Sequence, residues 1–338
     1  GWAVGALGTI LATQDGGRTW QLQRPGGRRA ALWAAFTRPE RTPLELIAKH
    51  AASEGYITAA TYLFAPREDS GDLSALETSR THEAVVGSGG SAAEIAWQLP
   101  LPHDAAALST EALLAELNRQ TDSQAMEQLE ARLVRDIRMW RPEVVLIELP
   151  VAMGGDPAAA LLQSAIESAL VAAADATRYP ELVAAGLKPW QPKRLCGLEP
   201  QGRPGALRIS TGEFSSTLGS SLAQFAAANA GLLTRDYAPP QANYDLSVLH
   251  TTAPGTSLQR DLFDGLVVNR DSDARRPQTA PAVGELDMLR RLAQQRRHMQ
   301  ELLKRSAGNE AWAGQGVNLT GGLDANSGGE LLFQLAEG

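Results

Sequence analysis

The feature that most constrains the fold is an alternation of short apolar runs with helix-like segments between residues 30 and 200. Five runs predict strands: AALWAAF (30–36), YITAATYLF (56–64), AEIAWQLPL (93–101), PEVVLIEL (142–149) and PKRLCGLE (192–199). The run at 142–149 is apolar almost throughout, as is typical of a parallel strand buried on both faces. Strands that alternate with helices at this spacing predict an α/β chain with a Rossmann-like, doubly wound, mostly parallel sheet.

The segments between and after these strands carry helix signals. Thr42 precedes Pro43 as an expected N-cap, and a loop at 65–75 precedes a short helix at 79–90. Helices are also expected at 109–120, 123–140, 156–176 and 210–231. In the last of these, Ser210 and Glu213 form an expected capping box and Gly231 an expected C-cap. A late strand pair is expected at 244–252 and 265–271.

The first 24 residues have a different texture. Apolar and polar residues alternate around the turn TQDGGRTW (13–20), which predicts a β-hairpin. Asp15 can accept backbone N–H bonds across the turn, and Gly16 and Gly17 supply positive φ angles. The turn resembles the Asp-box repeat of sialidase-like and photosystem-assembly-type β-propellers. That resemblance implies one partial blade, with further blades upstream.

Composition shifts suggest the remaining boundaries. We expect a linker at 25–29, an α/β domain at 30–270, a second linker at 271–284, a long basic helix at 285–306 and a Gly-rich tail at 307–338. The sequence begins with Gly1 and ends inside a pattern, so we interpret it as a fragment of a longer, multidomain bacterial protein.

Bulk composition excludes some classes of function. The formal net charge is -7, which argues against a nucleic-acid partner. One cysteine allows no internal disulfide, and no apolar stretch approaches the roughly 20 residues of a membrane helix. The compartment stays open, although Asp-box propellers are often extracytoplasmic, which favours an extracytoplasmic location.

Charged residues gather where the first and fourth strands end, the usual place for chemistry in such a sheet. Arg38, Glu40 and Arg41 follow the first strand, and Glu148 and Asp156 follow the fourth. These residues can be interpreted as a metal-free acid/base site, as a polar ligand pocket, or as Arg–carboxylate pairs that fill a cavity. The last interpretation is favoured, because charged loop residues are usually solvated or paired.

Several longer blocks resemble the LmbE/PIG-L family of zinc-dependent N-deacetylases. They are RMWRPEVVLIELPVAMGGDPAAALLQSAIESAL (138–170), ADATRYPELVAAGLKPWQPKRL (174–195) and SRTHEAVVGSGGSAAEIAWQLPL (79–101), the last with Arg80 and Glu83. The resemblance covers about half of the chain. It implies a Rossmann-like fold, a zinc cofactor and hydrolysis of N-acetylated sugars.

The metal site that the resemblance implies is degenerate here. Its His-Pro-Asp-Asp motif, with two zinc ligands and a general base, falls on Arg38, Glu40 and Arg41 around the retained Pro39. Its second block places an oxyanion-stabilising His at Asp156 and the third zinc ligand at Ala159, with Glu148 at a preceding His. Arginine stays protonated at any usable pH, so we expect no metal. Glu40 is the one candidate base.

Three functions remain open. The leading hypothesis is a non-catalytic deacetylase-like domain, a pseudoenzyme that binds a glycan or a protein partner or acts as a scaffold. The alternatives are an active hydrolase with an altered site, and a purely structural spacer.

Other candidates are weaker. No histidine has metal-ligand spacing with a partner; the five are His50, His82, His103, His250 and His298. The stretch GSGGS (87–91) is interpreted as a turn and not as a phosphate-binding loop. Cys196 is expected to be a buried, unreactive thiol. The serines at 210–221 lack the pattern of a nucleophile elbow. The basic helix at 285–306 is interpreted as a solvated connector and not as a helix that binds an anionic surface.

Overall fold

The computed structural model describes residues 1–4, 10–24, 29–66, 71–96, 99–102, 104–151, 156–233, 241–252, 260–268 and 273–276. By its internal contacts the chain divides into Gly1–Pro277 and Gln278–Gly338. The expected basic helix (285–306), the tail (307–338) and most of both expected linkers lie outside the described residues.

A seven-stranded sheet organises the first unit, in the order β11-β14-β10-β9-β4-β5-β7. Its strands are β4 (Leu32–Phe36), β5 (Thr58–Tyr62), β7 (Ala92–Ile95), β9 (Val144–Glu148), β10 (Arg194–Leu198), β11 (Leu207–Ser210) and β14 (Asn243–Thr251). The five strands from β7 to β10 pair in parallel, and β14 pairs antiparallel with β10 and β11. The prediction of a doubly wound, mostly parallel sheet is therefore confirmed.

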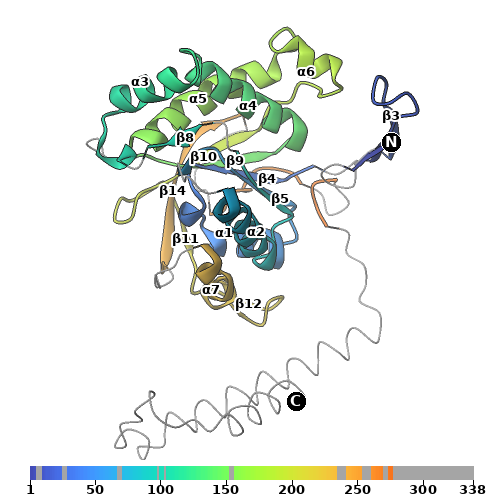
Figure 1. Ribbon diagram of the computed structural model, residues 1–338. Helices are drawn as coiled ribbons and strands as arrows, with labels where there is room; N and C mark the ends of the chain where they lie inside the picture. The colour runs from blue at the N-terminus through green and yellow to red at the C-terminus, as the bar shows by residue number, and fades with distance from the viewer. Residues whose placement is uncertain are drawn as a thin grey trace, which may run out of the picture. The chain divides into compact units, whose positions relative to one another are not determined.

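Helices cover both faces of the sheet (Figure 1). One face carries α3 (Thr110–Gln120), α4 (Ala125–Trp140) and α5 (Pro157–Ala174), with α6 (Pro180–Ala184) beside them. The other carries α1 (Leu44–Ile47), which continues as the π-helix η3 (Ala48–Ser53), with α2 (Gly71–Gly87) and α7 (Leu222–Leu233). Short elements complete the unit: the 3₁₀ turns η2 (Pro39–Arg41) and η4 (Ala105–Ala107), and the strands β6 (Ala65–Pro66), β8 (Pro100–Leu101), β12 (Phe214–Ser215) and β13 (Ser220–Ser221).

The central strands are apolar because both of their faces are buried. Every residue of β4 and β9 is buried. Successive side chains point to opposite faces, so Trp33 and Val145 join the core under α4 and α5, whereas Leu32 and Val144 join the core under α1 and α7. This is the pattern that a parallel sheet between two helical layers requires.

Among the described residues, α5 alone has the length and apolar composition that a membrane-crossing helix needs. Its residues are 61% buried within the domain, and it packs against α4 and the sheet. We therefore assign α5 as a core helix.

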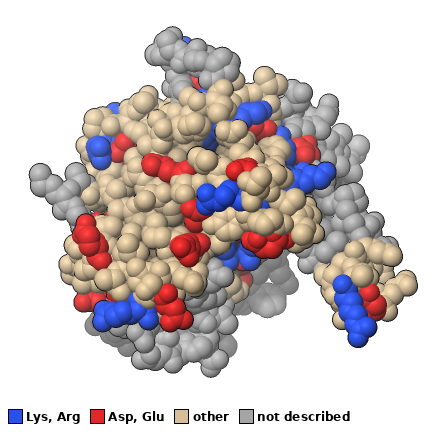
Figure 2. Space-filling model, turned by 90° about the horizontal axis from the view of Figure 1, so that it is seen from above, with Lys and Arg blue, Asp and Glu red and all other residues tan. Residues whose placement is uncertain are grey.

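Figure 2 shows that acidic and basic side chains are interspersed on the face it presents. No broad basic surface is seen among the described residues of that face. This distribution agrees with the overall acidic balance of the chain.

Three local predictions were wrong. The helix expected from Ser210 begins only at Leu222, because Ser210 ends β11 and residues 214–221 form a short hairpin. Gly231 lies inside that helix, so it is no C-cap. Strand 265–271 is absent among its described residues, and β14 pairs instead with the unpredicted β11. The side-chain hydroxyls at 210–221 can hydrogen-bond to the backbone of turns and strand edges as readily as to the start of a helix, so they do not by themselves specify a helix cap.

Helix boundaries also differ near the first two helices. Pro43, not Thr42, stands at the N-cap of α1, and the Thr42 hydroxyl donates instead to the Pro39 carbonyl at 2.6 Å. Helix α2 begins at Gly71, inside the expected loop.

The N-terminal residues form a three-stranded antiparallel sheet of β1 (Trp2–Val4), β2 (Ile10–Ala12) and β3 (Gln21–Arg24). Asp15 accepts the Thr19 backbone N–H at 2.9 Å, and Gly16 and Gly17 have positive φ, so the predicted turn chemistry is confirmed. These contacts lie within the turn and account for its conformation. The propeller that the Asp-box resemblance implies remains a prediction.

Candidate functional site at the strand switch point

The order of the strands places the topological switch point of the sheet between β4 and β9, and the edge at the carboxyl ends of these two strands is called the crevice below. The chain proceeds from β4 to β5 on one side, whereas β10 lies beyond β9 on the other, so the direction of winding reverses between these two strands. Their register pairs Ala35 with Ile147, which brings the carboxyl ends of both strands to one edge. Ligands of open α/β sheets bind outside such a switch point.

Glu148 is the last residue of β9 and the most constrained charge at this edge. Its side chain is 5% exposed, and its Oε1 accepts the backbone N–H of Thr37 at 2.5 Å. Burial raises the pKa of Glu148, while the hydrogen bonding of Thr37 and the charge of Arg41 act in the opposite direction. The ionised form of Glu148 is therefore stabilised by the hydrogen bonding of Thr37 and by the charge of Arg41.

Arg41 supplies the neighbouring cation. The 3₁₀ turn η2 brings its Nη1 to 3.3 Å from Glu148 Oε2 and its Nη2 to 2.6 Å from Asp156 Oδ2. The side chain of Arg41 is 39% exposed, whereas that of Asp156 is 6% exposed. One guanidinium thus lies between two buried carboxylates, one at the end of β9 and the other at the start of α5.

Asp156 also starts helix α5. Its Oδ1 accepts the backbone N–H of Ala159 at 3.2 Å, so the residue is the N-cap. One oxygen therefore satisfies the helix and the other contacts Arg41. The carboxylate is fixed by the fold and cannot reorient without uncapping α5.

The remaining predicted residues do not join this group. Arg38 is half-buried and Glu40 is exposed, and neither makes an ion pair within the described part of the chain. Burial raises the pKa of Tyr62, and the charge of Glu40 acts in the same direction. Ala159 is fully buried and offers only its backbone N–H.

The donor set at the crevice fits zinc poorly. Among the described residues it offers two carboxylates and a guanidinium, whereas zinc sites in proteins are rich in histidine and cysteine. A dication between the carboxylates would have to displace a permanent cation. The arrangement can bind a polar group through Arg41 or accept hydrogen bonds at the carboxylate oxygens.

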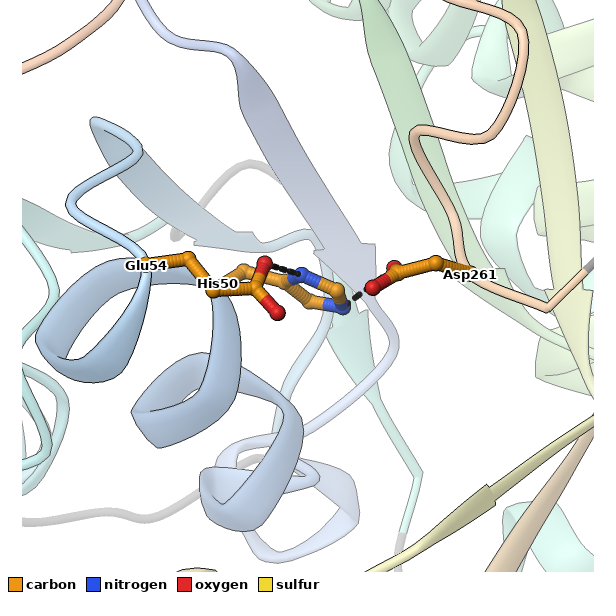
Figure 3. Close-up of side chains that lie close together, drawn as sticks. All are labelled: His50, Glu54 and Asp261. Carbon is orange, nitrogen blue, oxygen red and sulfur yellow. Dashed lines mark hydrogen bonds and ion pairs between the residues drawn. The ribbon is translucent and has the colours of Figure 1, made fainter. Parts of the chain in front are cut away.

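A second charged cluster surrounds His50, in the π-helix η3 (Figure 3). Its Nδ1 lies 3.0 Å from Glu54 Oε2, and its Nε2 lies 3.6 Å from Asp261 Oδ1. Lys49 joins the two carboxylates: its Nζ contacts Glu54 Oε1 and lies 3.1 Å from Asp261 Oδ2. These residues are named the His50 cluster below.

The His50 cluster corrects the prediction that no histidine has a ligand-type partner. The i,i+4 spacing of His50 and Glu54 was a visible signal, since such pairs share one helix face. Asp261 could not be found in the same way, because it lies far along the chain from His50 and only the fold joins them.

Aromatic rings close the cluster on one side. The His50 ring meets Phe263 edge-on, with centroids 5.5 Å apart, and lies 6.4 Å from Tyr56. Arg275 lies over the Tyr56 ring and donates to the Glu54 carbonyl at 2.8 Å. The histidine is fully buried as a result.

Two hollows lie among the described residues, both away from the switch-point edge. A hollow of about 210 Å³ opens on Lys49, Ser53, Glu54 and Glu213. A shallower groove of about 670 Å³ runs along α4 and α5; its polar centre is Glu130, which accepts hydrogen bonds from Arg178 and Tyr179 at 2.8 Å each.

The weaker candidates are also placed. Cys196 is fully buried, and burial raises the pKa of its thiol to about 12, so it is unreactive as predicted. Gly89 has a positive φ in the turn between α2 and β7, which confirms the turn at 87–91. His82 and His250 are exposed, and His103 and His298 lie outside the described residues.

Comparison with known proteins gives limited likeness. No model of a protein family matches the sequence, and no curated protein sequence matches it. Among solved structures, an N,N'-diacetylchitobiose deacetylase from Pyrococcus horikoshii is similar at 12% identity and a TM-score of 0.43, over 64% of this chain and 74% of that one.

Two further structures are similar to the same extent. The conserved protein TT1542 from Thermus thermophilus shares 15% identity, with a TM-score of 0.41 over 60% of this chain and 78% of that one. GalB, the 4-carboxy-2-hydroxymuconate hydratase from Pseudomonas putida, shares 13%, with a TM-score of 0.44 over 68% and 99%. Overlaps of this extent identify no activity for the chain.

Proposed function

We propose that this chain is a non-catalytic binding domain of the LmbE/PIG-L deacetylase type, whose switch-point crevice operates without a metal. The observation that supports it is the contact of Arg41 with both Glu148 and Asp156. The sequence resemblance aligns Arg41 with a zinc-binding aspartate. A guanidinium at that position occupies the space of a divalent cation and already neutralises charge on the two carboxylates that the cation would need.

A binding role follows from what the crevice retains. Arg41 is partly exposed and keeps free donor capacity, since a guanidinium carries five N–H groups. Two buried carboxylates beside it present fixed acceptors. Hydroxyl-rich ligands pair with such a set of donors and acceptors, and the resemblance makes an N-acetylated sugar the first ligand to test.

The first experiment measures catalysis. The full 338-residue chain is incubated with an N-acetylglucosamine oligosaccharide, with and without added Zn²⁺, and acetate release is followed. We expect no turnover under either condition. Acetate release that disappears in Glu40→Gln would instead establish the altered-site hydrolase.

The second experiment measures metal at the crevice itself. Zinc is quantified by elemental analysis in His50→Gln, which removes the imidazole of the separate His50 cluster. We expect less than stoichiometric zinc. A full equivalent that is lost on Glu148→Gln would place zinc at the crevice and refute the proposal.

The third experiment measures binding. Titration calorimetry with the same oligosaccharide is expected to give saturable heat that weakens in Arg41→Met and persists in Arg38→Met. Absence of binding to the folded wild-type chain would reject the sugar as the ligand of this crevice.

A further inference from the structure

The two ring nitrogens of His50 have different surroundings. Nδ1 lies at hydrogen-bond distance from Glu54 Oε2, so in a neutral imidazole this nitrogen carries the proton and donates it. The hydrogen bond thereby leaves a lone pair on Nε2. A carboxylate on the outer nitrogen is the arrangement that orients metal-binding histidines.

Nε2 has no hydrogen-bond partner among the described residues, although His50 is fully buried. It faces Asp261 Oδ1 across 3.6 Å, which is beyond the range of a hydrogen bond. Two acceptors that face each other in a buried place repel unless a cation lies between them. Zinc bonds to nitrogen and to carboxylate oxygen are each roughly 2.0 to 2.2 Å long, so one ion can span this gap.

Lys49 does not occupy the gap. Its ammonium contacts Glu54 Oε1 and Asp261 Oδ2, which are the other oxygens of the two carboxylates. With a neutral His50, two carboxylates and one ammonium leave the cluster one negative charge. A partly buried cluster with surplus negative charge attracts a further cation.

Solvent can reach the proposed ligands from the Asp261 side. The Asp261 side chain is 22% exposed, whereas His50 is fully buried. Water at the Asp261 carboxylate can complete the coordination of an ion that the protein holds by two atoms. The hollow of about 210 Å³ lies on the other side of the cluster, at Lys49 and Glu54.

We propose that His50 Nε2 and Asp261 Oδ1 bind a divalent transition-metal ion of the zinc class, with Glu54 holding Nδ1. Imidazole and carboxylate ligands together suit zinc and cobalt better than calcium. The site lies near the amino end of β5, whereas the crevice lies at the carboxyl ends of β4 and β9. It is therefore independent of the proposed function.

The proposed ion joins two distant parts of the chain. His50 belongs to η3, and Asp261 belongs to the described segment 260–268, which also places Phe263 on the histidine ring. Binding of the ion is expected to protect the backbone amides of this segment from hydrogen exchange.

The test titrates the full chain with Zn²⁺ by calorimetry and with Co²⁺ by visible absorption. We expect saturable one-to-one binding, with ligand-field bands of cobalt bound to nitrogen and oxygen. Affinity should fall at least about tenfold in His50→Gln and in Asp261→Asn, and by roughly 10- to 100-fold in Glu54→Gln, which alters the outer partner. Lys49→Gln should raise the affinity, because it removes a nearby positive charge.

The matched control is His82→Gln, the same substitution at an exposed histidine, which should leave the affinity unchanged. Circular dichroism of each variant establishes that it is folded, and Asp261→Asn carries the test if His50→Gln is not. No saturable binding by the wild-type chain would overturn the proposal. So would an affinity unchanged in both His50→Gln and Asp261→Asn, because the ion would then bind elsewhere.

Discussion

Replacing Arg41 by methionine is the most direct perturbation of the crevice. Methionine keeps much of the aliphatic length and removes the guanidinium between Glu148 and Asp156, whose side chains are 5% and 6% exposed. Loss of one partner from a buried ion pair costs about 3 to 5 kcal/mol. Arg41 itself is 39% exposed, so solvent screening reduces the expected loss of unfolding free energy to about 2 to 3 kcal/mol.

Urea unfolding at pH 7 measures this loss, with Arg38→Met as the control. Arg38 is a nearby arginine and has no ion pair with a described residue, so its substitution should change the unfolding free energy by less than about 0.5 kcal/mol. A double-mutant cycle with Glu148→Gln should give a coupling of about 1 kcal/mol.

The pH dependence of the same variant has a defined sign. Burial raises the folded pKa of Glu148 above its unfolded value, so ionisation of this carboxyl costs stability as the pH rises and its protonation relieves that cost as the pH falls. Removing Arg41 strengthens this effect. The stability difference between wild type and Arg41→Met should therefore shrink as the pH falls through the titration of Glu148. Equal stability of Arg41→Met, Arg38→Met and wild type at pH 7 would refute the reasoning.

Three further predictions concern the scaffold and the His50 cluster. Arg138 is almost fully buried and donates five hydrogen bonds to carbonyls at the end of α5 and in the turn that follows it. Arg138→Met should therefore lower the melting temperature and reduce the free energy of unfolding in urea by about 3 kcal/mol. The control is Arg119→Met at an exposed arginine, which should change neither quantity. A methyl group at Gly205 would collide with the backbone of Leu246, so Gly205→Ala should cost about 1 to 3 kcal/mol by the same assay. Burial of Glu54 opposes its ionisation, but His50 and Lys49 lower its folded pKa from 4.5 to about 2. Its stabilisation is therefore present above pH 4.5 and lost as the pH falls through 2, so Glu54→Gln should flatten the acid limb of the stability profile; an unchanged limb would count against this.

Local pattern was enough to predict the sheet and its helical layers. Strands such as PEVVLIEL are apolar on both faces because helices cover both faces of the sheet. A continuous apolar run in the sequence therefore predicts a strand that is buried on both sides. The turn around Asp15 and the helix α4 were predictable for the same reason, since neighbours in sequence make the contacts. The positions of Arg41, Glu148 and Asp156 at one edge followed from strand order.

Hydroxyl-rich sequence was a poorer guide. Residues 210–221 carry a capping pattern, yet pairing of β11 with β14 draws Ser210 into the sheet instead. A strand whose partner lies far along the chain has no local signal that outweighs a helix cap.

The sequence by itself determined the layered sheet and the place of the charged residues at the carboxyl ends of its first and fourth strands. Only the tertiary structure decided which charges pair: Arg41 takes both carboxylates, whereas Arg38 and Glu40, its neighbours in sequence, make no ion pair with a described residue. It also joined Asp261 to His50 across most of the chain. The physical reason is that periodicity reports which face of an element is buried, whereas a charge pair depends on side-chain geometry between elements that the sequence separates.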